Sequence, residues 1–185
     1  MNTTTPNFDD PLMFQEFLRR HIPGANEVIN GAMHQIFYAN ARQYQFEENF
    51  LRNSGLTSPQ FNLLVCLLRG ELLWGLQGLR PSEISLMHGT SRNNVSVVLA
   101  RLEEKKLISR TVHESDRRGF LIQLTPEGRL LVEKLVKPYF MLYNLAAEDF
   151  SAEEQTMFLS LLGRYYKNLV KMCEQSQAEP AEDNN

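Results

Sequence analysis

The chain has 185 residues, of which 43% are hydrophobic and 22% charged, so its composition is that of a globular protein and not of a collagen-like, coil-only or disordered one. No apolar run approaches the ~20 residues of a transmembrane helix, and the N-terminal segment lacks the features of a signal peptide. The net charge of −3 hides a basic middle, because residues 80–129 carry nine Lys or Arg against six Asp or Glu. We therefore expect a cytoplasmic protein that has no contact with membranes.

The N-terminal third is predicted to be helical. Residues 11–21 form a short amphipathic helix. From Ala25 to Leu51 no proline interrupts the chain, and apolar residues recur at steps of three and four, which predicts one long helix. Thr57 and Gln60 have the spacing of a capping box and mark the start of the next helix.

A helix-turn-helix is predicted after a glycine-containing connection. Residues 70–80 contain three glycines and are expected to form a loop or a short edge strand, in which Trp74 is covered by other residues. Pro81 opens a short helix that ends at Gly89. Thr90 or Ser91 caps a second helix after only two or three residues, which is the spacing of a helix-turn-helix.

A β-hairpin and two further helices complete the expected elements. Residues 107–112 and 120–124 are apolar or alternating strands on either side of the polar segment HESDRRG. Helices follow from Pro126 to about Asp149, with a possible kink at Pro138, and from Ser151 to about Cys173. The predicted divisions are residues 1–55, helices of a dimerisation region; 56–125, a DNA-binding domain; 126–174, further dimerisation helices; and 175–185, a disordered acidic tail.

The second helix of the helix-turn-helix has two different faces. Its apolar stripe, which includes Val95 and Leu99, is expected to pack on the core. The opposite face carries small and amide side chains, which suit the DNA major groove because Asn hydrogen-bonds adenine edges and Ala or Val contacts thymine methyls. The alternative is an ordinary solvated face. The residues predicted to contact DNA are Thr90, Ser91, Arg92, Asn93, Asn94, Ser96, Val97, Arg101, Arg117 and Arg118.

The hairpin tip extends this basic surface. Arg117 and Arg118 on a thin arm fit a narrow minor groove, where the negative potential is enhanced. Asp116 would be repelled by phosphate, so we expect it to pair with an arginine and fix its direction. A solvated turn is the alternative.

The segment from Pro81 to Gly128, PSEISLMHGTSRNNVSVVLARLEEKKLISRTVHESDRRGFLIQLTPEG, resembles the MarR family of transcriptional regulators. The resemblance implies a mainly α fold with a minor β part: a winged helix-turn-helix with a two-stranded wing and an all-helical dimerisation region. It also implies a repressor that binds operator DNA. By this likeness Arg118 reads the minor groove, Asp116 orients it, and residues 92–101 read the major groove.

A homodimer is also indicated by the residues themselves. The helices from Ala25 and from Ser151 carry large apolar residues on several faces, so they require a partner, either a second copy or each other. A two-fold dimer would place its two reading helices about one DNA turn apart and predicts a pseudo-palindromic operator.

A candidate ligand site is formed by aromatic and sulfur-containing residues, although such a stripe also suits a plain core. The MarR resemblance implies that a small aromatic or lipophilic effector bound there relaxes DNA binding. The candidate residues are Met33, His34, Phe37, Tyr38, Phe61 and Trp74.

No motif for catalysis, a metal or a cofactor is present, so we expect neither an enzyme nor a metalloprotein. The two cysteines cannot form a four-thiolate zinc site. Cys66 lies among leucines as a small hydrophobe, whereas Cys173 is expected to be accessible. Two alternatives to the ligand-responsive DNA-binding regulator remain, a thiol-based redox sensor on the same fold and a winged-helix module that binds protein.

Overall fold

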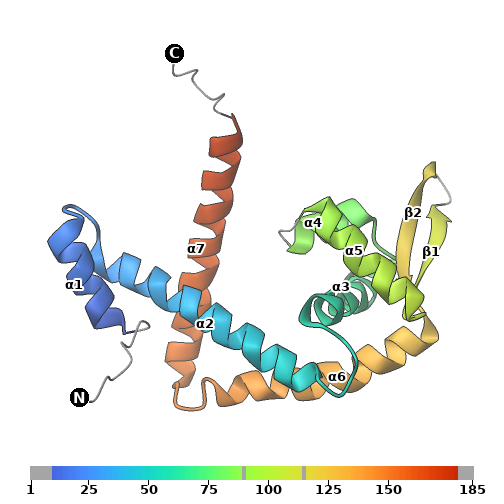
Figure 1. Ribbon diagram of the computed structural model, residues 1–185, viewed down its shortest axis with the longest axis horizontal. Helices are drawn as coiled ribbons and strands as arrows, with labels where there is room; N and C mark the ends of the chain where they lie inside the picture. The colour runs from blue at the N-terminus through green and yellow to red at the C-terminus, as the bar shows by residue number, and fades with distance from the viewer. Residues whose placement is uncertain (1–9, 89–90, 114–115, 179–185) are drawn as a thin grey trace, which may run out of the picture. The chain divides into compact units, whose positions relative to one another are not determined.

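The computed structural model describes residues 10–88, 91–113 and 116–178; for His88, His113, 116–119 and 177–178 it describes the backbone alone. The expected mainly helical fold with one hairpin is confirmed (Figure 1). The elements in order are α1 (Pro11–His21), α2 (Glu27–Leu51), α3 (Ser58–Trp74), α4 (Pro81–His88), α5 (Arg92–Glu104), β1 (Ile108–His113), β2 (Asp116–Leu124), α6 (Pro126–Leu145) and α7 (Ala152–Ala178).

The chain divides within α6 into two compact units, residues 1–136 and 137–185. The first contains α1 to α5, the hairpin and the start of α6. The second contains the rest of α6 and α7. No helix in the described ranges combines the length and the apolar content that crossing a membrane requires.

The early helices begin at side-chain caps, and α2 starts at Glu27, two residues after the predicted Ala25. The Asp10 carboxylate accepts a hydrogen bond from the Leu12 amide at 2.9 Å, and the Asn26 side chain accepts one from the Ile29 amide at 3.0 Å. At α3 the Thr57 amide donates to the Gln60 side chain at 3.2 Å, as the capping pattern predicted. Local hydrogen bonding therefore fixes where each of these helices starts.

The segment from Gly70 to Arg80 differs from its prediction. Its first part continues α3 to Trp74, and the helix ends at Gly75, whose φ of 63° lies in the left-handed region. A glycine inside a helix costs only about 1 kcal/mol, and the residues that follow Gly70, Glu71 and two leucines, favour a helix. Its end forms an isolated β-bridge in place of the predicted edge strand, because Leu79 exchanges two backbone hydrogen bonds with Ile122 of β2, at 3.0 and 2.8 Å.

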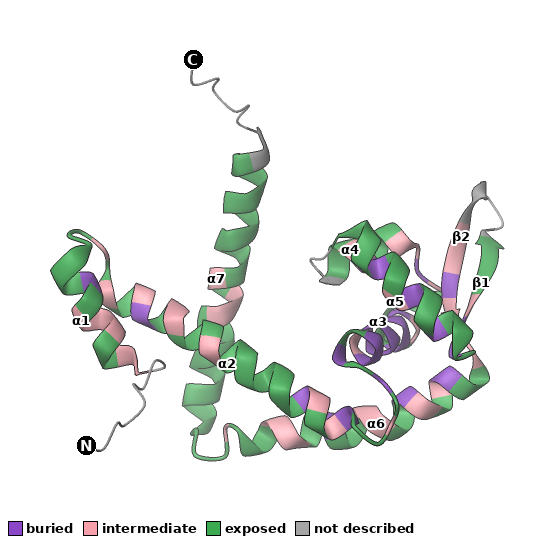
Figure 2. Cartoon of the chain, in the orientation of Figure 1, coloured by how far each residue is buried: buried purple, intermediate pink, exposed green. Residues whose placement is uncertain are grey.

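The core of the first unit is built around α3, which is buried along most of its length (Figure 2). Helices α4 and α5 and strand β2 pack on it. The most deeply buried apolar side chains are Leu51, Phe61, Leu64, Leu67, Ile84, Leu99, Leu102, Ile122 and Val132. Trp74 is outside this core with 55% of its surface exposed, so the expectation that other residues cover it is wrong for the single chain.

The hairpin is antiparallel, with Ile108 opposite Leu124 and Val112 opposite Phe120. Its register shifts after Val112, where His113 pairs with Asp116. Strand β2 therefore starts at Asp116, four residues before the predicted start, and the first residues of the predicted tip belong to the strand.

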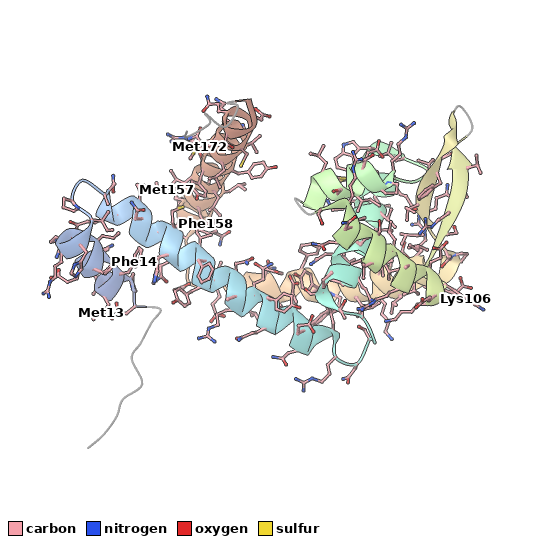
Figure 3. All side chains as sticks on the ribbon, turned by 45° about the horizontal axis from the view of Figure 1, so that its top comes forward. Met13, Phe14, Lys106, Met157, Phe158 and Met172 are labelled. Carbon is pink, nitrogen blue, oxygen red and sulfur yellow. The ribbon has the colours of Figure 1, made fainter. Side chains whose placement is uncertain are left out.

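The base of the hairpin is tied to the start of α6. The Thr125 hydroxyl donates to the carbonyl of Lys106 at 2.7 Å and accepts from the Gly128 amide at 3.0 Å. Gly128 is so close to Leu107 that a Cβ atom at this position would lie 1.9 Å from the Leu107 carbonyl oxygen. Lys106, labelled in Figure 3, makes the turn after α5 with a φ of 58°.

The second unit consists of helical segments with exposed apolar residues. Helix α6 contains Pro138 and ends at Leu145, before the predicted end, whereas α7 continues beyond the predicted Cys173 to Ala178. The predicted cap of α7 is present, with the Ser151 amide donating to Glu154 at 2.8 Å and the Glu154 amide donating to Ser151 at 3.2 Å. Residues 179–185 of the predicted acidic tail lie outside the described residues.

Candidate nucleic-acid interface

Helices α4 and α5 form the two helices of the predicted helix-turn-helix. The Ser91 hydroxyl caps α5 by accepting from the Asn94 amide at 3.3 Å, which decides between the two predicted caps. Ile84 of α4 and Val95, Leu99 and Leu102 of α5 are buried. The predicted apolar stripe therefore anchors α5, and Val98 at its margin is half-buried.

The opposite face of α5 is exposed. Val97 exposes 54% of its surface, although it is a large apolar residue in the middle of a helix. The Ser96 hydroxyl bonds back to the Arg92 carbonyl at 2.9 Å, so it lies flat on the helix. The predicted contact residues that the structure describes are all exposed: Ser91, Arg92, Asn93, Asn94, Ser96, Val97 and Arg101.

The remaining predicted contact residues belong to two segments. Thr90 lies outside the described residues, as do the side chains of Asp116, Arg117 and Arg118. Their backbone from Asp116 is the start of β2, so the three residues are on the hairpin as predicted. Their roles toward DNA stay predictions.

Sequence reasoning missed one cation of the hairpin, Arg110. Its guanidinium donates to the Glu103 carboxylate at 3.0 Å and lies 4.8 Å from the centre of the Phe120 ring. Arg110 thus connects β1 to the end of α5, which fixes the hairpin relative to the exposed helix. The spacing of Glu103 and Arg110 gives no local signal, because the contact depends on the turn between helix and strand.

The six residues of the candidate ligand set do not come together. On α2, His34 stacks against Phe14 of α1 with 4.0 Å between ring centres, and it lies 4.8 Å from Tyr38. Met33 is half-buried and Phe37 is exposed. Phe61 is fully buried in the core of the first unit, and Trp74 is at the far end of α3.

A cavity that the sequence analysis missed lies in the first unit, between α2, α3, α4 and α5. Its volume is about 580 Å³, and its apolar wall includes Leu63, Ile84, Val95 and Val98. Its polar lining includes Glu47, a carboxylate of which only 4% is exposed. No sequence pattern marks this cavity, because its residues come from four elements and each position taken alone is typical of an amphipathic helix.

The cysteines occupy the two environments that were expected. Cys66 is buried and Cys173 is exposed. Burial raises the pKa of the Cys66 thiol, and Arg69 opposes this shift only in part. Within the ranges that the structure describes, no group of three or more His, Cys, Asp and Glu side chains could hold a metal ion.

Two short helices, an exposed polar face on the second and a hairpin directly after it define a winged helix-turn-helix protein. A model of the MarR family matches residues 54–119. The repressor YetL of Bacillus subtilis is 25% identical over 134 residues, which are 72% of this chain and 78% of YetL. The regulator PecS of Dickeya dadantii is 32% identical over 115 residues, which are 62% of this chain and 68% of PecS.

Solved structures agree with these sequence relatives. The S. aureus MepR–DNA complex matches with a TM-score of 0.65 at 25% identity and covers 73% of this chain and 94% of the MepR chain. The regulator SlyA, which at 19% identity bears on the fold alone, has a TM-score of 0.69 and covers 78% of this chain and 98% of its own. The chain belongs to the MarR family, and it is a transcriptional regulator and not an enzyme.

Proposed function

We propose that the protein is a homodimeric repressor that binds a pseudo-palindromic operator and is released from it by a small ligand. The observation that carries the DNA-binding part is the exposed face of α5, where amide and small side chains stand over a buried apolar stripe. The MepR relative is described in complex with DNA, and the relative YetL is a repressor. The MepR complex supports binding to DNA, and YetL supports repression.

On DNA, α5 would lie in the major groove. Asn93 and Asn94 are placed in its first turn, where an amide can form paired hydrogen bonds with an adenine edge. The backbone amides at the start of α5 and the Ser91 hydroxyl would hold a phosphate and set the position of the helix. Arg117 and Arg118 on the hairpin would enter the neighbouring minor groove, with Asp116 orienting Arg118.

The dimer would be formed by the helices at the two ends of the chain. Helices α1 and α2 expose Leu12, Val28 and Phe37, and α7 exposes apolar residues that include Met157, Phe158 and Met172 (Figure 3). So many exposed large apolar side chains on a single chain indicate a protein partner. A second copy fits best, because a two-fold dimer matches a palindromic operator.

The ligand would act by favouring a conformation whose two α5 helices do not match the spacing of the operator. Such a shift can be no larger than the difference in ligand affinity between the two conformations. We place the effector in the cavity of the first unit, because residues of α5 line this cavity. None of the six residues of the candidate ligand set lines it.

Fluorescence anisotropy with labelled DNA from upstream of the gene tests DNA binding. We expect log Kd to change with log salt with a slope magnitude of about 5 to 9, the value for six to ten phosphate contacts. Arg101→Ala should reduce the slope by about one. Lys171→Ala, which removes one exposed positive charge from α7, should leave it unchanged.

Two outcomes would contradict the proposal. Affinity that is independent of salt and of DNA sequence would exclude an operator-binding protein and favour a protein-binding module. A reporter placed behind the bound promoter should be more active after deletion of the gene, and reduced activity would mean an activator.

A further inference from the structure

Two lysines follow the last residue of α5, and the first of them, Lys105, turns back to earlier parts of the chain. Its ammonium group donates hydrogen bonds to the carbonyl oxygen of Gly55 and to the side-chain oxygen of Gln60, the second at 3.1 Å. These acceptors are 50 and 45 residues away in the sequence. The contacts therefore join the end of α5 to the loop after α2 and to the first turn of α3.

The protein holds both acceptors in place. Gln60 is only 3% exposed, and the oxygen that accepts from Lys105 also accepts from the Thr57 amide, at 3.2 Å. In the loop, the Ser54 hydroxyl donates to the Leu51 carbonyl at 2.7 Å. Because a hydrogen bond is directional, a tie to fixed acceptors restricts the orientation of α5 as well as its distance from the loop.

Lys105 is remote from the first turns of α5, where most of the predicted DNA contacts lie. The helix has 13 residues. At a rise of about 1.5 Å per residue, its two ends are about 20 Å apart. The first residues of the reading helix are those that contact base edges in helix-turn-helix proteins. In addition, two of the three N–H groups of Lys105 are directed to acceptors in the protein, which places its charge poorly for a phosphate.

The buried stripe of α5 leaves a freedom that Lys105 can restrict. Val95, Leu99 and Leu102 are buried in the core, but apolar contacts are not directional and permit small changes of tilt. A tilt of about 5° at one end of a helix of this length moves its other end by about 2 Å. Hydrogen bonds to base edges do not survive such a displacement. A directional tie at the end of α5 therefore affects base reading at its start.

We propose that Lys105 is a positioning residue for operator binding, which fixes the orientation of α5 relative to the end of α2 and does not neutralise a phosphate. Helix α2 is one of the helices proposed to form the dimer. The same tie would therefore help to set the spacing between the two reading helices. This inference rests on the proposed function, because its effect is on operator binding.

Salt titrations of DNA affinity distinguish positioning from a phosphate contact. Lys105→Met keeps the length of the side chain and removes the ammonium group. We expect it to weaken binding to DNA from upstream of the gene about threefold to tenfold, the range that corresponds to one net hydrogen bond. The matched control is Lys106→Met, which removes the same charge one residue later and should weaken binding less. Both variants should keep the salt slope of the unaltered protein, whereas loss of a phosphate contact lowers it by about one.

Two further measurements separate positioning from a general loss of stability. Inserting one base pair between the two half-sites should weaken binding of the unaltered protein, and weaken binding of Lys105→Met by a smaller factor, because its α5 is less firmly oriented. A protein that is only less stable would lose the same factor on both DNA sites. Lys105→Arg keeps the charge and offers donors to the same acceptors, so it should restore most of the affinity.

A salt slope lowered by about one in Lys105→Met alone would overturn the proposal, because it would assign Lys105 to a phosphate. Equal affinities of Lys105→Met and Lys106→Met would also overturn it and would leave the proposed function intact.

Amide hydrogen exchange without DNA tests the tie independently of the proposed function. Exchange in the last turn of α5 and in residues 52–57 should be about threefold or more faster in Lys105→Met and unchanged in Lys106→Met. If the unaltered protein does not bind the DNA, the proposed function fails, and faster exchange in Lys105→Met still supports the tie. Unchanged exchange in Lys105→Met would overturn the positioning role whatever the DNA result.

Discussion

Asn93 and Arg118 are expected to contribute to DNA binding in different ways. Asn93 is exposed in the first turn of α5, where its amide can distinguish one base from another, whereas an arginine in the minor groove mainly meets the backbone potential. We predict that Asn93→Ala relaxes base preference, and that Arg118→Ala weakens binding to all sequences by about 1 to 3 kcal/mol.

Titrations against the operator and a set of single-base variants measure both effects. The groove assignment is wrong if both variants retain the affinity and the selectivity of the unaltered protein. Lys171→Ala on α7 serves again as the control, because Lys171 is exposed and is not among the residues predicted to contact DNA.

Cys66 should react slowly with alkylating reagents. Burial raises the pKa of its thiol, so at a given pH a smaller fraction is the reactive thiolate, and the reagent has little access. At mildly alkaline pH, iodoacetamide should therefore modify the exposed Cys173 well before Cys66. Because the pKa of Cys66 is raised, its rate of alkylation should continue to increase with pH above the range in which an ordinary thiol titrates. Peptide mass spectrometry of timed samples gives both rates, and equal rates would favour Cys66 as a redox sensor.

The turn between α5 and β1 has a backbone conformation that favours glycine. Lys106 has a φ of 58°, a conformation that costs a residue with a side chain about 1 to 2 kcal/mol. Glycine avoids this cost, but its greater conformational entropy in the unfolded state cancels part of the gain. We expect Lys106→Gly to raise the free energy of unfolding by about 0.5 to 1 kcal/mol. Lys106→Ala, which removes the charge and keeps the Cβ atom, should give no such gain in a urea titration.

The contact between the start of α6 and the turn before β1 requires a glycine. A Cβ atom on residue 128 would overlap the Leu107 carbonyl, so Gly128→Ala should lower the free energy of unfolding by at least about 1 to 3 kcal/mol. Gly70→Ala is the matched control. Its Cβ atom would be at an ordinary 3.6 Å from Leu79, and we expect no loss of stability. Equal stability of the two variants would contradict the close approach.

Elements with strong local signals could be predicted from the sequence, and elements fixed by tertiary pairing could not. The caps at Thr57 and Ser151 act within one turn of their helices, so both helix starts were predicted. The glycines suggested a loop from residue 70, but Glu71, Leu72 and Leu73 favour a helix and continue α3 to Trp74 although Leu72, Leu73 and Trp74 are exposed. The early start of β2 depends on the pairing of His113 with Asp116, which is not visible in a local sequence window.

The same distinction holds for the candidate site. The exposed and buried faces of α5 follow from helical periodicity alone and were predicted residue by residue. The cavity was not, because Glu47 and Ser58 are on different helices and come together only in the fold. Aromatic content, which suggested a ligand site on α2, reports burial as readily as binding.

The whole molecule should be a dimer. Leu159 of α7 exposes 74% of its surface in the single chain, and we expect a second copy to cover it. We predict that Leu159→Glu shifts the protein from twice its chain mass of 21.4 kDa toward the monomer and weakens operator binding. Analytical ultracentrifugation measures the mass directly.

Leu72→Glu is the control for this experiment. Leu72 on α3 is 68% exposed and is therefore comparable to Leu159, but it belongs to the first unit and to none of the helices proposed to form the dimer. It should leave the dimer mass unchanged. Dissociation by both substitutions, or by neither, would contradict the assignment of α7 to the dimer interface.

Asn94 and Val97 line the cavity and also belong to the face of α5 that is predicted to contact DNA. Under the proposed function, a mutation at either position alters effector recognition and promoter recognition together. Genetic selection for a different inducer should therefore also recover protein variants with altered promoter recognition. Substitutions that change inducer recognition alone are expected at lining residues outside α5, such as Glu47 and Gln43.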